Sequence, residues 1–131
     1  MRPSKTDYYL DIAAQVAKRS TCLRRQYGAI VVRDDQIIGT GYNGSARGII
    51  NCCDRGTCQR EAMGVPPGER YELCESVHAE VNACLAAGRE RCIGATLYIA
   101  GWQGDQRLDS PAPCFMCARV IRNCGIKEVI S

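Results

Sequence analysis

Two short segments that lie far apart in the sequence constrain the fold of this chain more than any other feature. The first contains His78, the single histidine among 131 residues, and Glu80 two positions later. The second is Pro113-Cys114-Phe115-Met116-Cys117. Zn²⁺ accepts imidazole and thiolate ligands, and a catalytic zinc site has three protein ligands and one open position. We therefore predict that the fold brings His78, Cys114 and Cys117 together as metal ligands.

The spacing within each segment has a physical reason. Two cysteines separated by two residues can direct both sulfurs at one ion from the first turn of a helix, where free N–H groups and the helix dipole favour thiolates. Pro113 suits such a helix start. Glu80 is not needed as a ligand, and it is well placed to take a proton from a metal-bound water. His-x-Glu followed by Pro-Cys-x-x-Cys is a signature of zinc-dependent nucleobase deaminases.

The length of 131 residues suits a single domain, residues 1–131, with one core. No apolar run approaches the ~20 residues of a membrane helix, and the start of the chain lacks a signal-peptide core. We therefore expect a cytoplasmic protein that does not enter a membrane. Ten cysteines then indicate metal binding instead of a disulfide scaffold, with some buried thiols left over.

The net charge is +3, and 14 of the 17 basic residues are arginine. A guanidinium group binds phosphate or carboxylate through two parallel hydrogen bonds, so this bias suits a phosphate-bearing ligand. The charge is well below that of a dedicated nucleic-acid-binding domain. We therefore expect a small-molecule partner and no nucleic acid, and many of these arginines also suit an ordinary solvated surface.

Hydrophobic periodicity places the regular elements. It predicts helices over residues 7–19, 78–88 and 114–124, and strands over 29–32, 36–41, 95–100 and 126–130. Cys84 and Leu85 are expected to face inward from the second helix, and Val120 and Ile121 from the third. The segment 101–112 is expected to be irregular. This order predicts an α/β sandwich whose second half is mostly parallel.

Residues 43–77 have no periodicity and contain several glycines. A structureless loop of that length is improbable inside a compact domain unless something holds it in place. Cys52, Cys53, Cys58 and Cys74 all lie in this segment. We therefore predict a second, closed zinc site that replaces the missing hydrophobic core of this cysteine-rich insertion.

The chain resembles the cytidine-deaminase-like superfamily, and within it the deoxycytidylate (dCMP) deaminases, over nearly its whole length. The resemblance is carried by His78-Ala79-Glu80, Pro113, Cys114 and Cys117, and more selectively by Gly28-Ala29, Gly41-Tyr42-Asn43-Gly44-Ser45, the cysteine-rich insertion and the ending Gly125-Ile126-Lys127-Glu128-Val129-Ile130. It implies a three-layer α/β/α sandwich with a central mixed sheet, shortened at the C-terminus. Because a further strand and helix of many relatives do not follow, we expect a subunit of a homo-oligomer to cover that edge.

The resemblance also implies roles for single residues. His78, Cys114 and Cys117 would bind the catalytic zinc, and Glu80 would transfer protons. The backbone of Ala79 would touch the base, and Asn43 would contact the sugar. Some relatives hold a second, structural zinc, to which a cysteine matching Cys22 and one matching Cys52 contribute. For the remaining two ligands we select Cys58 and Cys74, with Cys53 as the alternative, and we expect Cys84, Cys92 and Cys124 to be buried thiols.

The expected reaction is hydrolysis of dCMP to dUMP and ammonia. Zinc lowers the pKa of a bound water from ~16 toward ~7, Glu80 takes its proton, and hydroxide attacks C4 of the cytosine ring. Arg24, Arg25 and Arg47 are candidates for the 5′-phosphate. Arg89 is a candidate for an allosteric site of the kind that binds dCTP and dTTP in some relatives. The segment 101–112 is longer than in most relatives and is expected to border the substrate pocket.

Three alternatives remain open at this point. A deaminase of another nucleoside or nucleotide, or of tRNA or single-stranded DNA, shares the zinc motif, although a polynucleotide needs a stronger basic or aromatic channel. A zinc-stabilised interaction module without catalysis has no use for Glu80. A dithiol redox pair formed by Cys114 and Cys117 would bind no metal, and the sequence lacks a thioredoxin-like context for it.

Overall fold

The computed structural model describes all 131 residues. Its elements in chain order are α1 Lys5–Ala17, β1 Gln26–Arg33, β2 Gln36–Tyr42, β3 Gly44–Ser45, α2 Cys52–Arg55, α3 Gln59–Ala62, η1 Tyr71–Leu73, β4 Ser76–Val77, α4 Ala79–Ala87, α5 Arg89–Cys92, β5 Thr96–Gln103, β6 Gln106–Arg107, α6 Phe115–Asn123 and β7 Glu128–Ile130. None of these helices has the length and apolar character needed to cross a membrane.

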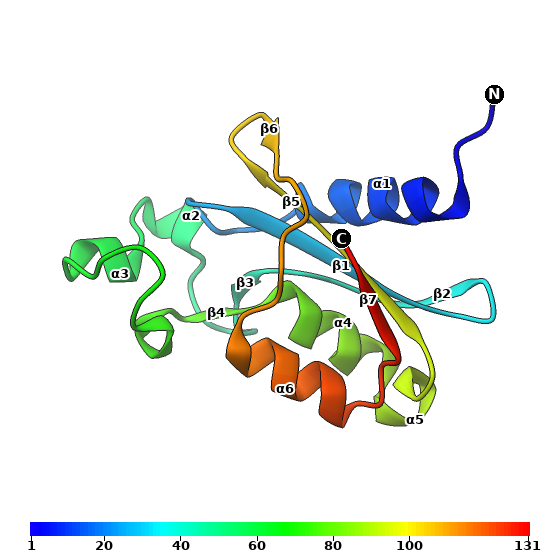
Figure 1. Cartoon of the computed structure of the whole chain (residues 1–131). Helices are drawn as coiled ribbons and strands as arrows, with labels where there is room; N and C mark the ends of the chain where they lie inside the picture. Colours follow the sequence, from blue (N-terminus) through cyan, green and yellow to red (C-terminus); the bar gives the residue numbers. More distant parts are fainter.

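A five-stranded mixed sheet forms the middle layer. β1 lies between β2 and β5 and is antiparallel to both. On its other side β5 pairs with β7, which runs parallel to it, and with β6, which is antiparallel. Helix α1 covers one face of the sheet, and α4 and α6 cover the other, as Figure 1 shows. The predicted three-layer α/β/α sandwich is therefore confirmed.

Helix α1 begins two residues earlier than the periodicity predicts. The Oγ atom of Ser4 accepts a hydrogen bond of 3.1 Å from the backbone N–H of Asp7, so Ser4 is the N-cap of this helix. Its inner face buries Tyr9, Ala13 and Ala17 against β1 and β5. This packing forms the core on one side of the sheet.

Helix α4 lies very close to the sheet. An ideal Cβ atom on Gly41 of β2 would lie 2.4 Å from the backbone N of Ala83, and one on Gly39 would lie 2.5 Å from the Ala83 carbonyl oxygen. Because these glycines have no side chain, the alanine-rich face of α4 packs directly on the backbone of β2. The start of α4 is thereby fixed at the end of the sheet where β2 ends.

Two inward orientations predicted for the helices are wrong. Leu85 is 73% exposed, because α4 buries the positions that surround Ala83 and Leu85 lies on the opposite face. In α6 the buried residue is Ile121, whereas Val120 is exposed. Cys84 and Cys92 are buried thiols, as predicted, and Cys124 is half-buried beside the same core.

The segment 101–112 is less irregular than predicted. Strand β5 continues to Gln103 and turns back through β6, so that Trp102 pairs with Arg107. This hairpin docks on α1, because the indole Nε1–H of Trp102 donates a hydrogen bond of 2.8 Å to the carbonyl of Ala14. Arg107 also forms an ion pair with Asp11 at 2.7 Å. The hairpin therefore extends the sheet and ties it to the first helix.

The cysteine-rich insertion projects from one end of the sandwich, beside the start of α4 (Figure 1). Its base is closed by β3 and β4, in which Gly44 pairs with Val77 and Ser45 with Ser76. Between them lie α2, α3 and η1, none longer than a single turn or so. The prediction that this segment lacks long periodic elements is therefore confirmed.

Candidate metal centre and the cavity beside it

His78 and Cys114 occupy equivalent positions, each immediately before a helix. His78 is the N-cap of α4, and Cys114 is the N-cap of α6. The sulfur of Cys114 accepts a hydrogen bond of 3.4 Å from the N–H of Cys117. Because α4 and α6 lie side by side with their starts at the same end (Figure 1), segments distant in sequence meet there.

The three predicted ligands come within reach of one ion. The Nδ1 atom of His78 lies 3.1 Å from the sulfur of Cys117 and 3.5 Å from that of Cys114. All three donor atoms lie within 4.8 Å of one another. Tetrahedral bonds of about 2.05 Å to nitrogen and 2.3 Å to sulfur require a nitrogen–sulfur distance of about 3.6 Å. The residues therefore fit a zinc ion.

Glu80 lies beside this cluster without belonging to it. Its side chain is 6% exposed and forms part of the wall of the adjoining cavity. No lysine, arginine or histidine forms an ion pair with it. No fourth histidine, cysteine or carboxylate joins the three ligands. The arrangement thus leaves one tetrahedral position open, with a carboxylate close by.

Burial raises the pKa of the Cys117 thiol, and the nearby Glu80 carboxylate raises it further. Both effects disfavour a negative charge on sulfur, so the thiol keeps its proton when no cation is near. A divalent cation bound between the three donors reverses this preference, because thiolate is the form that binds metal. The local electrostatics therefore suit a cation and not a free thiolate.

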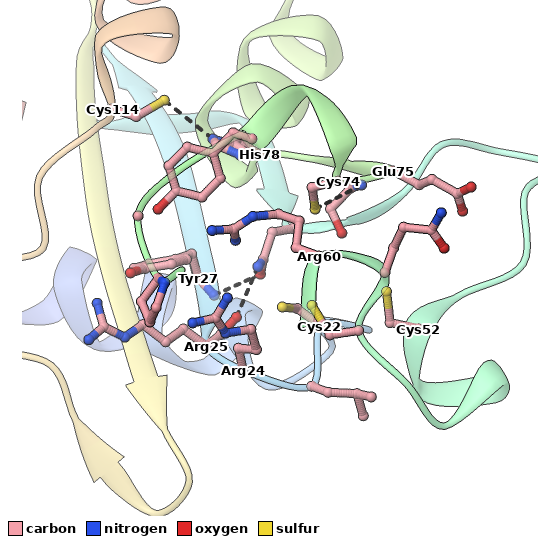
Figure 2. Close-up of a pocket in the computed structure, with 18 of the residues that line it drawn as sticks. Cys22, Arg24, Arg25, Tyr27, Cys52, Arg60, Cys74, Glu75, His78 and Cys114 are labelled. Carbon is pink, nitrogen blue, oxygen red and sulfur yellow. Dashed lines mark hydrogen bonds between the residues drawn. The ribbon is translucent and has the colours of Figure 1, made fainter. Parts of the chain in front are cut away.

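A cavity of about 690 Å³ adjoins the metal centre. His78, Glu80 and Cys114 form part of its wall, and residues of the insertion form the opposite part. Figure 2 shows His78 and Cys114 toward one end of this cavity and Cys22 and Cys52 toward the other. The volume falls within the range of pockets for small organic ligands. The metal centre is therefore open to a molecule of the size of a nucleotide.

Asn43 lines this cavity, as its predicted contact with a sugar requires, but its amide is also held by the backbone. Its Oδ1 atom accepts a hydrogen bond of 2.8 Å from the N–H of Tyr27, and its Nδ2 donates one of 2.9 Å to the carbonyl of Arg25. Asn43 therefore fixes the start of β1. Ala79 is fully buried in the first turn of α4 and does not line the cavity wall.

The four cysteines predicted for a second site all line the insertion side of the cavity: Cys22, Cys52, Cys58 and Cys74. Figure 2 shows three of them gathered there. Burial raises the pKa of the Cys52 thiol, and the other three sulfurs raise it further. No three of the four sulfurs lie within 4.8 Å of one another, unlike the donors at His78. Cys53 is exposed and does not line the cavity.

Only two of the arginines predicted to bind a nucleotide lie at the cavity. Arg24 and Arg25 line the cavity, whereas Arg47 is exposed and does not. Arg89 lies beyond the other end of α4, where its Nε donates a hydrogen bond of 3.2 Å to the carbonyl of Asn123. Of the segment 101–112, only Gln103 and Ala112 line the cavity.

Arg60 and Tyr71 are among the residues of the cavity wall that sequence reasoning missed. The Arg60 guanidinium lies 4.4 Å from the centre of the Tyr71 ring. Tyr71 in turn meets the His78 ring edge-on, with centroids 5.7 Å apart. Both residues lie in the insertion, where no periodicity gives their orientation. The only signal in the sequence was the excess of arginine over lysine, which indicated a phosphate-bearing ligand without naming the arginine.

These features define a zinc-binding α/β domain with an open metal position. A mixed sheet lies between helices, and one imidazole, two thiolates and a carboxylate lie at the starts of two neighbouring helices. The chain matches the family described as the cytidine and deoxycytidylate deaminase zinc-binding region over residues 3–131. It belongs to this family.

The chain is similar to curated proteins named deoxycytidylate deaminase. It is 40% identical over 131 residues to that of Schizosaccharomyces pombe, with 98% of this chain and 37% of the relative covered. It is also 40% identical over 134 residues to that of Mycobacterium phage D29, with 98% and 94% covered. The chain thus spans little more than a third of the yeast protein and nearly all of the phage protein.

Among solved structures, the chain is similar to the dCMP deaminase of the cyanophage S-TIM5 in complex with dCMP and dUMP. The TM-score is 0.68 with 26% identity, and the match covers 98% of this chain and 81% of the phage chain. The fold expected from the sequence is therefore that of solved dCMP deaminases.

Replacement of Asn43 by alanine is expected to lower the free energy of unfolding by about 2 kcal/mol or more. The change leaves the N–H of Tyr27 and the carbonyl of Arg25 without their partner, and each buried unpaired group costs about 1–3 kcal/mol. Urea denaturation followed by circular dichroism measures this change in the free energy of unfolding. Asn51→Ala is the control, because the side chain of Asn51 bonds only the exposed Asp54, and its effect should stay within about 0.5 kcal/mol. Equal midpoints for both variants would contradict the backbone role of Asn43.

Proposed function

We propose that this protein catalyses the zinc-dependent hydrolytic deamination of a cytosine nucleotide, with dCMP converted to dUMP and ammonia. The observation that carries the proposal is the approach of His78 Nδ1 to the sulfurs of Cys114 and Cys117, with Glu80 in the wall of the same cavity. The family supports the reaction class. The names of the relatives and of the S-TIM5 complex with dCMP and dUMP support the substrate.

In the proposed mechanism each residue has a defined task. His78, Cys114 and Cys117 would hold zinc, which when bound would supply the Lewis acidity that lowers the pKa of water from ~16 toward ~7. Glu80 accepts the proton of the attacking water and returns protons to N3 of the ring and to the leaving amine. It is free for this work because no basic side chain pairs with it. One water is consumed for each ammonia released.

Asn43 and Ala79 are the proposed contacts to the sugar and the base. Asn43 lies in the cavity wall with its amide orientation fixed by the start of β1, so a second hydrogen bond of its Nδ2 group is available to a ligand. The N–H of Ala79 belongs to the first turn of α4, where backbone donors have no partner within the helix.

A second, structural zinc bound by Cys22, Cys52, Cys58 and Cys74 is proposed to hold the insertion in place. Its support is that these four cysteines alone among the ten line the insertion side of the cavity, and that the other three sulfurs add to burial in raising the pKa of the Cys52 thiol. Cys53 is not part of the proposed set, because its sulfur is directed elsewhere and contacts Asp54. The insertion would thereby gain the stability that its few apolar residues do not supply.

The chain is also proposed to form a homo-oligomer in the cytoplasm, a reducing compartment that suits ten free thiols. The outer face of α4 and α6 exposes large apolar side chains, among them Leu85 and Phe115, which is 90% exposed. Such a face favours contact with a second subunit. Regulation by dCTP or dTTP through Arg89 stays a prediction, which the effect of each nucleotide on the initial rate tests.

Glu80→Ala and Glu80→Gln are expected to lower kcat for dCMP by about 10²–10⁴, because general acid–base transfer contributes this factor. Both variants should keep their zinc, since Glu80 is not a ligand. Ammonia release and atomic absorption on the same sample measure the two quantities. A variant that keeps more than a tenth of the wild-type rate would remove the proposed role of Glu80. A substrate panel with cytidine, deoxycytidine and oligonucleotides separates dCMP from the alternatives.

Purified wild-type protein is expected to contain two zinc ions per chain, as measured by inductively coupled plasma mass spectrometry. Cys58→Ser should reduce the content to one and make the insertion sensitive to limited proteolysis, because one ligand of the second site is lost. Cys117→Ser should also reduce it to one, without that sensitivity. Cys53→Ser is the matched control and should keep both ions. A wild-type content of one ion would remove the second site.

The oligomer is expected to dissociate when the apolar face of α6 is made charged. Phe115→Glu changes the most exposed of these side chains and should lower the molar mass measured by size-exclusion chromatography with light scattering. Tyr8→Glu on α1 is the control, since Tyr8 is exposed on the opposite face of the sandwich. A monomeric wild-type protein would exclude the proposed assembly.

A further inference from the structure

Arg60 of α3 is a buried cation without a counter-charge. Its side chain is 5% exposed, and none of the ion pairs in the structure includes it. Its Nε and Nη2 atoms donate instead to the carbonyls of Glu69 at 3.0 Å and Pro66 at 3.4 Å. A guanidinium stays charged at all ordinary pH values, and a buried charge without a partner is costly. Arg60 therefore has no carboxylate within ion-pair distance.

Arg24 adds a second unsatisfied donor to the same cavity. Its Nε pairs with Glu61 at 3.0 Å, which fixes the orientation of the guanidinium. Its Nη1 is buried and has no hydrogen-bond partner. Glu75, another carboxylate of the cavity wall, is paired with Arg55 at 3.1 Å. Neither carboxylate is therefore free to neutralise Arg60.

The position of Arg60 relative to the metal centre matches the shape of a nucleotide. Tyr71 contacts both groups: the Arg60 guanidinium lies over its ring at 4.4 Å from the centre, and the His78 ring lies at 88° to it with centroids 5.7 Å apart. Figure 2 shows the Arg60 guanidinium reaching into the cavity between His78 and Tyr27. In a nucleotide, one sugar separates the base from the 5′-phosphate. A base at the metal centre would therefore place its phosphate on the insertion side, toward Arg60.

We propose that Arg60, assisted by Arg24, binds the 5′-phosphate of the substrate, so that the insertion selects nucleoside monophosphates over nucleosides. This inference rests on the proposed deamination of a cytosine nucleotide. A phosphate supplies the charge that Arg60 lacks and accepts the hydrogen bond that Arg24 Nη1 does not make. Hydrogen bonds between charged groups are about twice as strong as neutral ones, and a guanidinium suits phosphate geometry.

The test compares dCMP with deoxycytidine in three variants, Arg60→Gln, Arg60→Lys and Arg24→Gln. Arg60→Gln is expected to lower kcat/KM for dCMP by about 10- to 100-fold, the size of one lost hydrogen bond between charged groups. The value for deoxycytidine should stay within about twofold. Arg24→Gln should also lower kcat/KM for dCMP. Arg60→Lys, which keeps the positive charge, should lower it less than Arg60→Gln does. Arg55→Gln is the matched control, since Arg55 lies in the same insertion and pairs with Glu75 but is not itself part of the cavity wall.

Binding of the product analogues dUMP and deoxyuridine by calorimetry gives a second readout that needs no turnover. Arg60→Gln and Arg24→Gln should weaken the binding of dUMP and leave the binding of deoxyuridine unchanged. An equal loss for both ligands, or for both substrates, would show that Arg60 only supports the loop and would overturn the inference, as would no loss at all. A wild-type protein that binds dUMP through Arg60 but releases no ammonia would contradict the proposed function and leave the phosphate site standing.

Discussion

The approach of one imidazole nitrogen to two sulfurs at the starts of α4 and α6 is the contact on which the rest of the structure depends. It requires both helices to pack on the same face of the sheet with their starts together. Gly39 and Gly41 make this possible, because any side chain there would collide with the backbone of α4. The metal centre is thus a product of sheet packing, and Glu80 reaches the cavity because it belongs to the same first turn as His78.

The insertion supplies the other half of the cavity by different means. Its elements are too short to build an apolar core, so ion pairs such as Arg55–Glu75 and the contacts of Arg60 with two carbonyls hold it together. The proposed structural zinc and the proposed phosphate site therefore use the same segment. One would keep the insertion folded, and the other would let the folded insertion recognise the substrate.

Several predictions made from local sequence patterns are wrong, because tertiary contacts decide which residues are buried and which backbone segments pair. Leu85 is apolar and lies in an alanine-rich helix, yet the close packing of α4 on β2 selects the face of small residues and leaves Leu85 outside. The segment 101–112 has no strand periodicity, but Gln106 and Arg107 pair with the end of β5, where Trp102 is anchored on α1. In both cases a contact between distant elements outweighs the local preference.

The sequence by itself determined the ligand types, the acid beside them and the helices that begin there, because those features depend on residues within one turn of each other. It also indicated the sandwich, since the order of strands and helices restricts how layers can pack. Only the tertiary structure decided that Arg60 and not Arg47 lines the cavity, and that Asn43 holds the start of β1. These assignments depend on contacts across the fold, which no local pattern of residues encodes.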